Sequence, residues 1–358
     1  MSHDTETKSA TNGDNLDQLK LKVPKPLLDA KLAWHGISLD TRAKFLTTVF
    51  WVSTDDTKGV EDALTDCLEQ VALYQLSEGM LVIGESGSGK TWLCKMLARK
   101  YPDKELEDRT LRPFVVMKVP HPCSKPGLTT ALLEALKDPE PTQGTQRKRF
   151  ERAIGLFSDC AVRILAVDNF HDIPERRDKH GVRLVGNWFR DLIEEHVKVV
   201  FLPLGTKDAQ EVRISNNQVR RRVPTVKRLD YFTLTTTDGQ RRWVKLLFEI
   251  DLALPLAEFS DLAKAPLNSR LFIASNGVFD YLMKLIRRAI PIAVKAGRER
   301  IELCDLHVAY RSMHGDVEEA SNPFSDKFVQ RELTQIDDPF YAFDYGTSPA
   351  AKHVAKAH

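Results

Sequence analysis

One eight-residue segment constrains this chain more than any other: Gly84-Glu85-Ser86-Gly87-Ser88-Gly89-Lys90-Thr91. It satisfies G-x-x-x-x-G-K-[ST] at every fixed position. It follows the apolar run Met80–Ile83 and precedes a helical pattern of Leu93, Met96 and Leu97. A strand, a glycine-rich loop and a helix in that order direct backbone N–H groups and a helix N-terminus at one anion. The segment therefore predicts a site for nucleotide phosphates.

The expected cofactors of this site are ATP and Mg²⁺. Lys90 is expected to reach the β- and γ-phosphates, and Thr91 to bind the metal. A second metal group should end another buried strand, and the run Arg163–Val167 is followed by Asp168. The residues assigned to the nucleotide are Gly84, Glu85, Ser86, Gly87, Ser88, Gly89, Lys90, Thr91 and Trp92.

Asn169 follows Asp168, at a position where many ATPases of this kind carry Glu to polarise the attacking water. An amide cannot accept a proton in that way, so Asn169 would orient the water weakly, or Asp172 or Glu175 would be the base. Slow hydrolysis is expected, which suits a switch better than a motor. Thr206 ends the fourth apolar strand region and is expected near the γ-phosphate, because the carboxyl ends of parallel strands converge on the ligand.

An arginine-rich segment, Arg220-Arg221-Arg222, precedes Val223-Pro224. An arginine at a helix end can reach the ATP of a neighbouring subunit and stabilise charge on the transferred phosphoryl group. Arg222 is the preferred candidate because the chain before a proline tends to leave the helix. A solvated basic face is the alternative for each of the three arginines.

The fold class is predicted from four apolar, β-branched runs separated by helical patterns. This alternation indicates an α/β protein with a parallel sheet flanked by helices. Beyond about residue 235 the strand signal fades, and helices are expected over 241–251, 277–297 and 301–314, which predicts a small all-helical lid domain. The four runs are Met80–Ile83, Phe114–Val119, Ile164–Val167 and Val197–Leu202.

Composition bounds the domain organisation. The 358 residues include 42% apolar and 28% charged residues, and 52 Lys and Arg against 50 Asp and Glu give a net charge of +2. This excludes collagenous, low-complexity and histone-like chains. The five cysteines form no CxxC pair and no apolar run is long enough to span a membrane, so a cytoplasmic protein with reduced thiols is expected. The expected parts are a flexible N-terminal segment at 1–35, a nucleotide-binding core at 36–235, the lid at 236–315 and a flexible tail at 316–358.

Taken together, these motifs resemble AAA+ P-loop ATPases and, among them, the TniB/TnsC family of bacterial transposition regulators. The residues that carry the resemblance are GESGSGKT at 84–91, LAVDNFHDI at 165–173, LGT at 204–206 and RRRVP at 220–224. The resemblance covers about residues 36–312. Two departures concern hydrolysis: Asn169 replaces the usual Glu, and the lid lacks a well-spaced arginine, since Arg287 and Arg288 fit that position poorly.

The resemblance implies ATP-dependent rings, hexameric or heptameric, or helical filaments on duplex DNA. Such a homo-oligomer would link a TniQ-like target selector, as in a CRISPR-associated transposon, to a DDE transposase. The basic residues expected to meet DNA phosphates are Lys118, Lys125, Arg147, Lys148, Arg149 and Arg176, with Arg177 beside them. A solvated surface is the alternative for each of them.

Three other functions remain open from the sequence. A P-loop phosphotransferase would stay monomeric in ATP, whereas the favoured regulator would assemble. A nucleotide-gated scaffold would organise partners through ATP binding alone, which Asn169 allows. A helicase loader of the same ATPase class would prefer single-stranded over duplex DNA.

Overall fold

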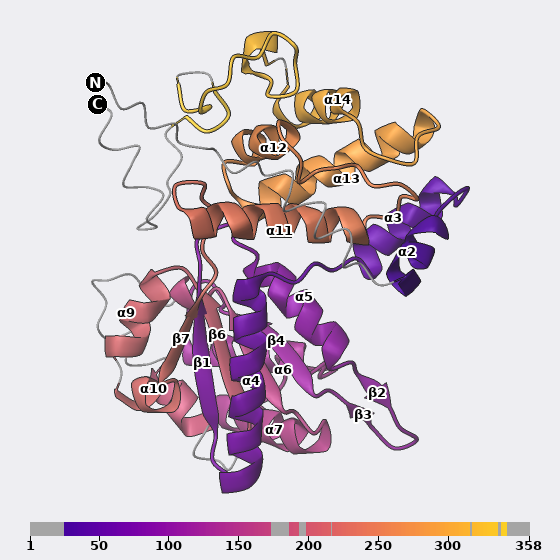
Figure 1. Ribbon diagram of the computed structural model, residues 1–358. Coiled ribbons are helices and arrows are strands. Elements are labelled where there is room, and N and C mark those ends of the chain that lie inside the picture. The colour runs from indigo at the N-terminus through magenta and orange to yellow at the C-terminus, as the bar shows by residue number, and fades with distance from the viewer. Residues whose placement is uncertain are drawn as a thin grey trace. The chain divides into compact units, whose positions relative to one another are not determined.

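The computed structural model describes residues 25–172, 186–192, 198–215, 217–315, 317–335 and 338–341. The chain divides into two compact units (Figure 1). The first is continuous, from Asp55 to Asp230, and contains the phosphate loop. The second combines the segment before Asp55 with the segment after Asp230.

A five-stranded parallel sheet is the centre of the unit 55–230, with strand order β4-β5-β6-β1-β7. Because the strands are parallel, their carboxyl ends lie at one edge. A separate antiparallel pair, β2 (Lys104–Glu105) and β3 (Thr110–Leu111), precedes the sheet's β4 strand. The sheet strands are β1 (Glu78–Ile83), β4 (Phe114–Lys118), β5 (Ile164–Asp168), β6 (Val200–Gly205) and β7 (Thr225–Arg228).

Alternate strand residues face the two sides of this sheet. Leu81, Val115, Leu165 and Phe201 belong to one apolar core with residues of α6, α7, the helix at 186–192, α9 and α10. On the opposite side α4 packs against β1 through the stripe Val60, Leu64, Cys67 and Val71 (Figure 1). The helices of this unit are α4 (Asp55–Tyr74), α5 (Lys90–Lys100), α6 (Lys125–Ala135), α7 (Gln146–Asp159), α9 (Asp208–Ser215) and α10 (Asn217–Arg222).

Capping residues fix where the helices beside the sheet begin. Ser124 accepts a hydrogen bond from the Gly127 N–H and starts α6, and Thr145 accepts one from the Lys148 N–H and starts α7. Each cap satisfies a backbone donor that the first helical turn leaves without a partner. The two helix N-termini are therefore held at defined places in the unit.

The predicted parallel sheet flanked by helices is confirmed, with differences in its detail. The fourth strand begins at Val200 rather than at Val197, which lies outside the described residues. The structure adds β7, a short strand whose residues are exposed or half-buried and therefore lack the apolar run of a central strand. It pairs with β1 at the edge of the sheet.

In the described part of the second unit, four α-helices follow Asp230, in agreement with the expected helical region; the sequence patterns did not predict α12. Its nine residues are too few for a clear apolar stripe. Helix α13 carries the expected stripe Leu282, Leu285, Ile286 and Ala289, all fully buried. The helices are α11 (Thr237–Ala253), α12 (Leu267–Ser275), α13 (Phe279–Lys295) and α14 (Leu303–His314).

The expected boundaries of an N-terminal segment at 1–35 and a core from 36 stay predictions; by their contacts, residues 36–54 group with the second unit. Helices α2 (Lys25–Leu32) and α3 (Leu39–Thr48) belong to the second unit. The Lys31 Nζ donates to the Asp251 carbonyl at 2.8 Å. Arg42, only 1% exposed, forms two hydrogen bonds to the Glu299 carboxylate, at 2.7 and 2.8 Å. Two buried cations thus fasten this segment, a contact that apolar patterning does not reveal.

The flexible tail expected from Asp316 also stays a prediction; within it, residues 317–335 and 338–341 are described, and Asp316 and residues 342–358 lie outside the described residues. Three apolar side chains of the tail, Phe324, Leu333 and Phe340, are 2–3% exposed, whereas Val329 is 77% exposed. The Arg331 guanidinium pairs with the Asp338 carboxylate, which is also buried. Isolated apolar residues in a polar segment can therefore anchor a loop without forming any periodic pattern.

Candidate nucleotide site

The phosphate loop lies between the end of β1 and the start of α5, as the motif requires. Gly87 and Gly89 have φ values of 79° and 107°, which side chains with a Cβ rarely adopt. A Cβ on Gly84 would lie 2.3 Å from the Ser88 Oγ and 2.6 Å from the Leu229 carbonyl oxygen. The loop therefore needs glycine at these positions for its own backbone shape.

Lys90 is the first residue of α5, and its side chain folds back over the loop. Its Nζ donates to the carbonyl oxygens of Gly84 and Glu85, at 2.6 and 2.9 Å. Burial lowers the pKa of Lys90, while the nearby Asp168 and Glu85 carboxylates act in the opposite direction. A half-buried ammonium group held by neutral carbonyls is a good partner for an anion.

Asp168 ends β5 and is 7% exposed. Its Oδ1 accepts a hydrogen bond of 2.9 Å from the Asn169 N–H. Asn169 has a φ of 58°, a left-handed conformation that asparagine tolerates better than most residues. The Asn169 carbonyl in turn accepts from the Asp172 N–H at 2.9 Å, which starts the short 3₁₀ turn Phe170–Asp172. Asn169 thus lies directly after the expected metal ligand.

Thr206 directly follows β6. The ends of β1 and β6 lie side by side at this edge of the sheet, where the Gly84 N–H donates to the Gly205 carbonyl at 3.0 Å. The Thr206 Oγ1 is buried and has no hydrogen-bond partner among the described residues. His171 is a residue of this edge that the sequence motifs did not predict. Its Nδ1 accepts a hydrogen bond of 3.3 Å from the Thr206 N–H. A Cβ on Gly205 would approach the His171 Nδ1 to 3.2 Å, so glycine there permits this contact.

The residues at this edge fit a nucleotide with Mg²⁺. The Ser88 Oγ, like the Thr206 Oγ1, is buried without a hydrogen-bond partner in the described part of the chain. Buried hydroxyl groups normally find a partner, so both are suited to a phosphate oxygen or its water. Thr91 and Asp168 supply one hydroxyl and one carboxylate, and Mg²⁺ is typically bound by one or two protein oxygens together with substrate phosphates.

Arg222 is the last residue of α10, as expected, and is half-buried. The following turn is fixed by Arg213, which donates to the carbonyl oxygens of Val223 and Pro224, each at 2.5 Å. Arg220 and Arg221 are exposed on the same helix. Among the described residues, the hydrogen bonds of Lys90, Asp168 and Thr206 do not include Arg222.

The basic residues expected to contact DNA fall into different environments. Lys118 is exposed at the end of β4, in register with Asp168. Arg147 and Lys148 are exposed in the first turn of α7, and Arg147 pairs with Glu151 at 2.8 Å. Lys125 begins α6 and pairs with Asp191 at 3.3 Å. These four side chains all keep some exposure to solvent.

Arg149 and Arg176 differ from these four. Arg149 is half-buried and donates to the Thr130 Oγ1 at 2.8 Å and to the Gln146 Oε1 at 3.4 Å. Its contacts join α6 to α7, which favours a packing role over DNA contact. Arg176, its neighbour Arg177 and the alternative base Glu175 lie outside the described residues.

The fold is that of AAA+ P-loop ATPases. Cdc6p from Pyrobaculum aerophilum is similar, with 17% identity and a TM-score of 0.53 over 77% of this chain and 72% of that chain. The Aeropyrum pernix ORC2 protein, solved as ADPNP–ADP complexes, has 12% identity and a TM-score of 0.51 over 78% and 75% of the two chains. Among the described helices, none is both long enough and apolar enough to cross a membrane.

The family follows from the sequence itself. The family model described as "Bacterial TniB protein" matches residues 42–231, more than half of the chain. The chain belongs to the TniB family, and the resemblance drawn from its motifs is confirmed. No curated protein is similar enough to this sequence to count as a match.

Proposed function

We propose that this protein is an ATP-dependent regulator of DNA transposition that assembles as a ring or helical filament on duplex DNA. One observation carries the proposal: Lys90, Asp168 and the hydroxyl groups of Ser88 and Thr206, which have no partner among the described residues, belong to elements that meet at one edge of the sheet. Membership of the TniB family supports the link to transposition. Duplex DNA, a TniQ-like selector and a DDE transposase are the proposed partners.

The side chains of the site have distinct proposed tasks. Lys90 holds the β- and γ-phosphates, Thr91 and Asp168 hold Mg²⁺, and Thr206 positions the attacking water near the γ-phosphate. When bound, Mg²⁺ neutralises charge on the phosphate oxygens. Asn169 orients the water but cannot take up its proton, so hydrolysis is slow and the ATP-bound state is long-lived.

Arg222 is the proposed contact across a subunit boundary. It ends α10, and no hydrogen bond or ion pair holds its side chain within the described part of the chain. A cation in that position is available to a neighbouring subunit's γ-phosphate, where it stabilises the transferred charge. ATP would then join two subunits, which explains why assembly should require nucleotide.

Sedimentation velocity tests this proposal with the full chain in Mg²⁺. We expect a monomer without nucleotide and a much larger species with ATP. Arg222→Ala should lose the large species while keeping ATP binding, and Arg220→Ala, an exposed arginine of the same helix, is the matched control. A chain that binds ATP and stays monomeric would instead favour a P-loop phosphotransferase.

Replacing Asn169 by glutamate is expected to accelerate hydrolysis. A placed general base contributes about 10²–10⁴-fold, and the lower part of that range is expected here because the new carboxylate lies beside Asp168. The measurement is steady-state phosphate release, with Asn169→Gln as a control that lengthens the side chain without adding a base. Equal rates for Asn169→Glu and wild type, with unchanged ATP affinity, would show that water activation is not limiting.

A further inference from the structure

The imidazole ring of His171 lies against the end of β6. His171 belongs to the short 3₁₀ turn after Asp168, and its Nδ1 accepts a hydrogen bond of 3.3 Å from the Thr206 N–H. A Cβ on Gly205 would come within 3.2 Å of the same Nδ1, so a larger residue there would crowd the ring. The glycine that ends β6 and the position of the imidazole are therefore matched to each other.

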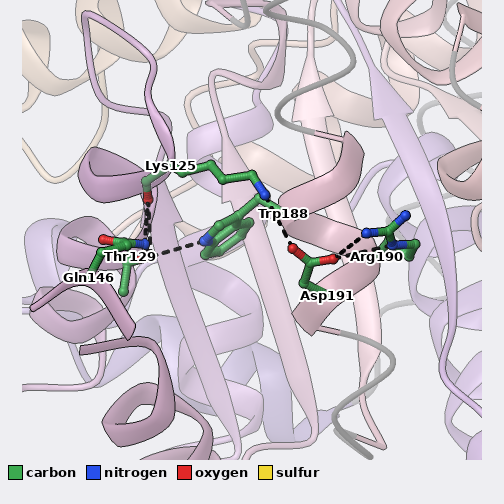
Figure 2. Close-up of polar contacts among 6 residues, drawn as sticks. All are labelled: Lys125, Thr129, Gln146, Trp188, Arg190 and Asp191. Atoms are coloured by element: carbon green, nitrogen blue, oxygen red, sulfur yellow. Dashed lines mark hydrogen bonds and ion pairs between the residues drawn. The ribbon is translucent and has the colours of Figure 1, made fainter. Parts of the chain in front are cut away.

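The turn that carries this histidine has a firm support. Phe170, the first residue of the turn, is fully buried, and its ring lies 5.7 Å from the Phe189 ring and 6.3 Å from the Phe201 ring on β6. The short helix that carries Phe189 is itself fastened to α6, because its Trp188 Nε1 donates to the Thr129 Oγ1 at 3.0 Å (Figure 2). The turn is consequently held at a defined distance from β6.

Both backbone groups of Thr206 are hydrogen-bonded in the short connection between β6 and α9. Its carbonyl accepts from the Ala209 N–H at 3.0 Å, and its N–H donates to the His171 ring. Threonine is β-branched and has few accessible χ1 values, so the direction of its hydroxyl follows the position of its backbone. The buried Thr206 Oγ1, which has no hydrogen-bond partner among the described residues, is thus placed in part by a histidine side chain.

We propose that His171 is a positioning residue for ATP hydrolysis, which holds Thr206 so that its hydroxyl faces the γ-phosphate and the attacking water. The inference rests on the proposed function, because that function places the γ-phosphate beside Thr206. Without the imidazole, the Thr206 N–H loses its protein acceptor and the end of β6 loses its link to the turn after Asp168. His171 therefore acts on the hydrolysis step through Thr206, without touching the nucleotide.

The contacts of the imidazole argue against a different role for His171, that of the general base. A neutral imidazole has one nitrogen that accepts and one that carries the hydrogen. Because Nδ1 accepts from the Thr206 N–H, the hydrogen lies on Nε2, which is 3.6 Å from the Asp172 Oδ1. Neither nitrogen then has a lone pair for the attacking water. The two roles predict different results for a substitution that keeps the acceptor but cannot take up a proton.

Single-turnover phosphate release, with the full chain in excess over ATP in Mg²⁺, tests the inference. His171→Asn keeps an acceptor, because the side-chain oxygen of asparagine takes the same place along the side chain as Nδ1. His171→Leu has a similar volume and no acceptor. His35→Leu is the matched control, since His35 is exposed and belongs to the other unit. Calorimetric titration gives the ATP affinity of each variant.

The expected result is a loss of rate without a loss of ATP binding. Misplacing a group by about 1 Å can cost about 10²-fold in rate, so His171→Leu is expected to slow hydrolysis by about 10- to 100-fold at unchanged ATP affinity. His171→Asn should keep most of the wild-type rate, because the Thr206 N–H retains an acceptor. His35→Leu should equal the wild type in both rate and affinity.

The outcomes separate this inference from the proposed function. No phosphate release by the wild-type chain would overturn both the inference and the proposed hydrolysis. Wild-type hydrolysis with an unchanged rate for His171→Leu would overturn the role of His171 alone. Equal losses of rate for His171→Asn and His171→Leu would also overturn that role, because they would fit a general base.

A second variant covers the case in which His171→Leu fails to bind ATP. His171→Ala only removes atoms and cannot crowd Gly205, so it then takes the place of His171→Leu in the same measurements. Slowed hydrolysis with normal ATP affinity in His171→Ala would support the inference. Loss of ATP binding in this variant as well would assign His171 to folding or to nucleotide binding, and would overturn the positioning role.

Discussion

Replacing Lys90 by alanine is expected to reduce ATP hydrolysis by about 10²–10³-fold, the usual cost of removing a group that stabilises developing charge, and to weaken ATP binding. The Lys90 ammonium is the charged donor of the loop, and its present partners are two carbonyl oxygens at 2.6 and 2.9 Å. Alanine leaves the loop backbone intact but removes the ammonium charge. Calorimetric titration with ATP and a phosphate-release assay measure the two effects.

Lys95→Ala is the control for this substitution. Lys95 lies on the same helix α5 and is exposed, so its removal tests the loss of a lysine without loss of the phosphate contact. Its ATP affinity should equal that of the wild type. If Lys90→Ala also binds and hydrolyses ATP normally, the phosphate loop has been assigned wrongly.

Binding to duplex DNA is expected to weaken by about 10³–10⁵-fold between 50 and 200 mM salt, as for proteins that neutralise six to ten phosphates. A single chain has a net charge of only +2, but an assembled ring or filament repeats its exposed Lys125, Arg147 and Lys148 along one axis. When those cations bind the phosphates, counterions are released, and this contribution to the affinity depends little on base sequence. Filter binding to two duplexes of unrelated sequence measures both the salt dependence of the affinity and its dependence on base sequence.

The triple substitution of Lys125, Arg147 and Lys148 by alanine should flatten this salt dependence, by about 0.9 log unit for each phosphate that the variant no longer neutralises. ATP affinity should stay unchanged, because none of the three side chains is hydrogen-bonded to the phosphate loop. Lys264→Ala, in the other unit, serves as the control for removing a surface lysine. A salt slope that survives the triple substitution would place the DNA contacts elsewhere.

The part of the fold that the sequence reveals is the part governed by short, regular patterns. The four apolar runs predict strands because residues buried on both faces leave an unbroken apolar segment. Strand β7 was missed because it is only partly buried at the edge of the sheet. The attachment of α2 and α3 to the C-terminal helices was missed because it depends on Lys31 and Arg42 reaching partners more than 200 residues away.

Some residues of the candidate site can likewise be predicted from the sequence and others cannot. Residues from Gly84 to Thr91 follow from the motif, since its spacing is set by the loop geometry itself. Asp168 and Thr206 follow from their positions at strand ends. His171 and Asp191 could not be anticipated, because each contacts a residue that is distant in sequence: Thr206 for His171 and Lys125 for Asp191. Such contacts require knowledge of which elements lie side by side.

The central claim is that ATP assembles this protein on duplex DNA, and negative-stain microscopy tests it most directly. The full chain is mixed with a long duplex at 50 mM salt in Mg²⁺ with ATP, a non-hydrolysable analogue, ADP or no nucleotide. The account predicts rings or filaments on the DNA with ATP and with the analogue, and bare DNA with ADP or without nucleotide. Equal coverage of the DNA in all four conditions, or bare DNA in all four, would contradict it.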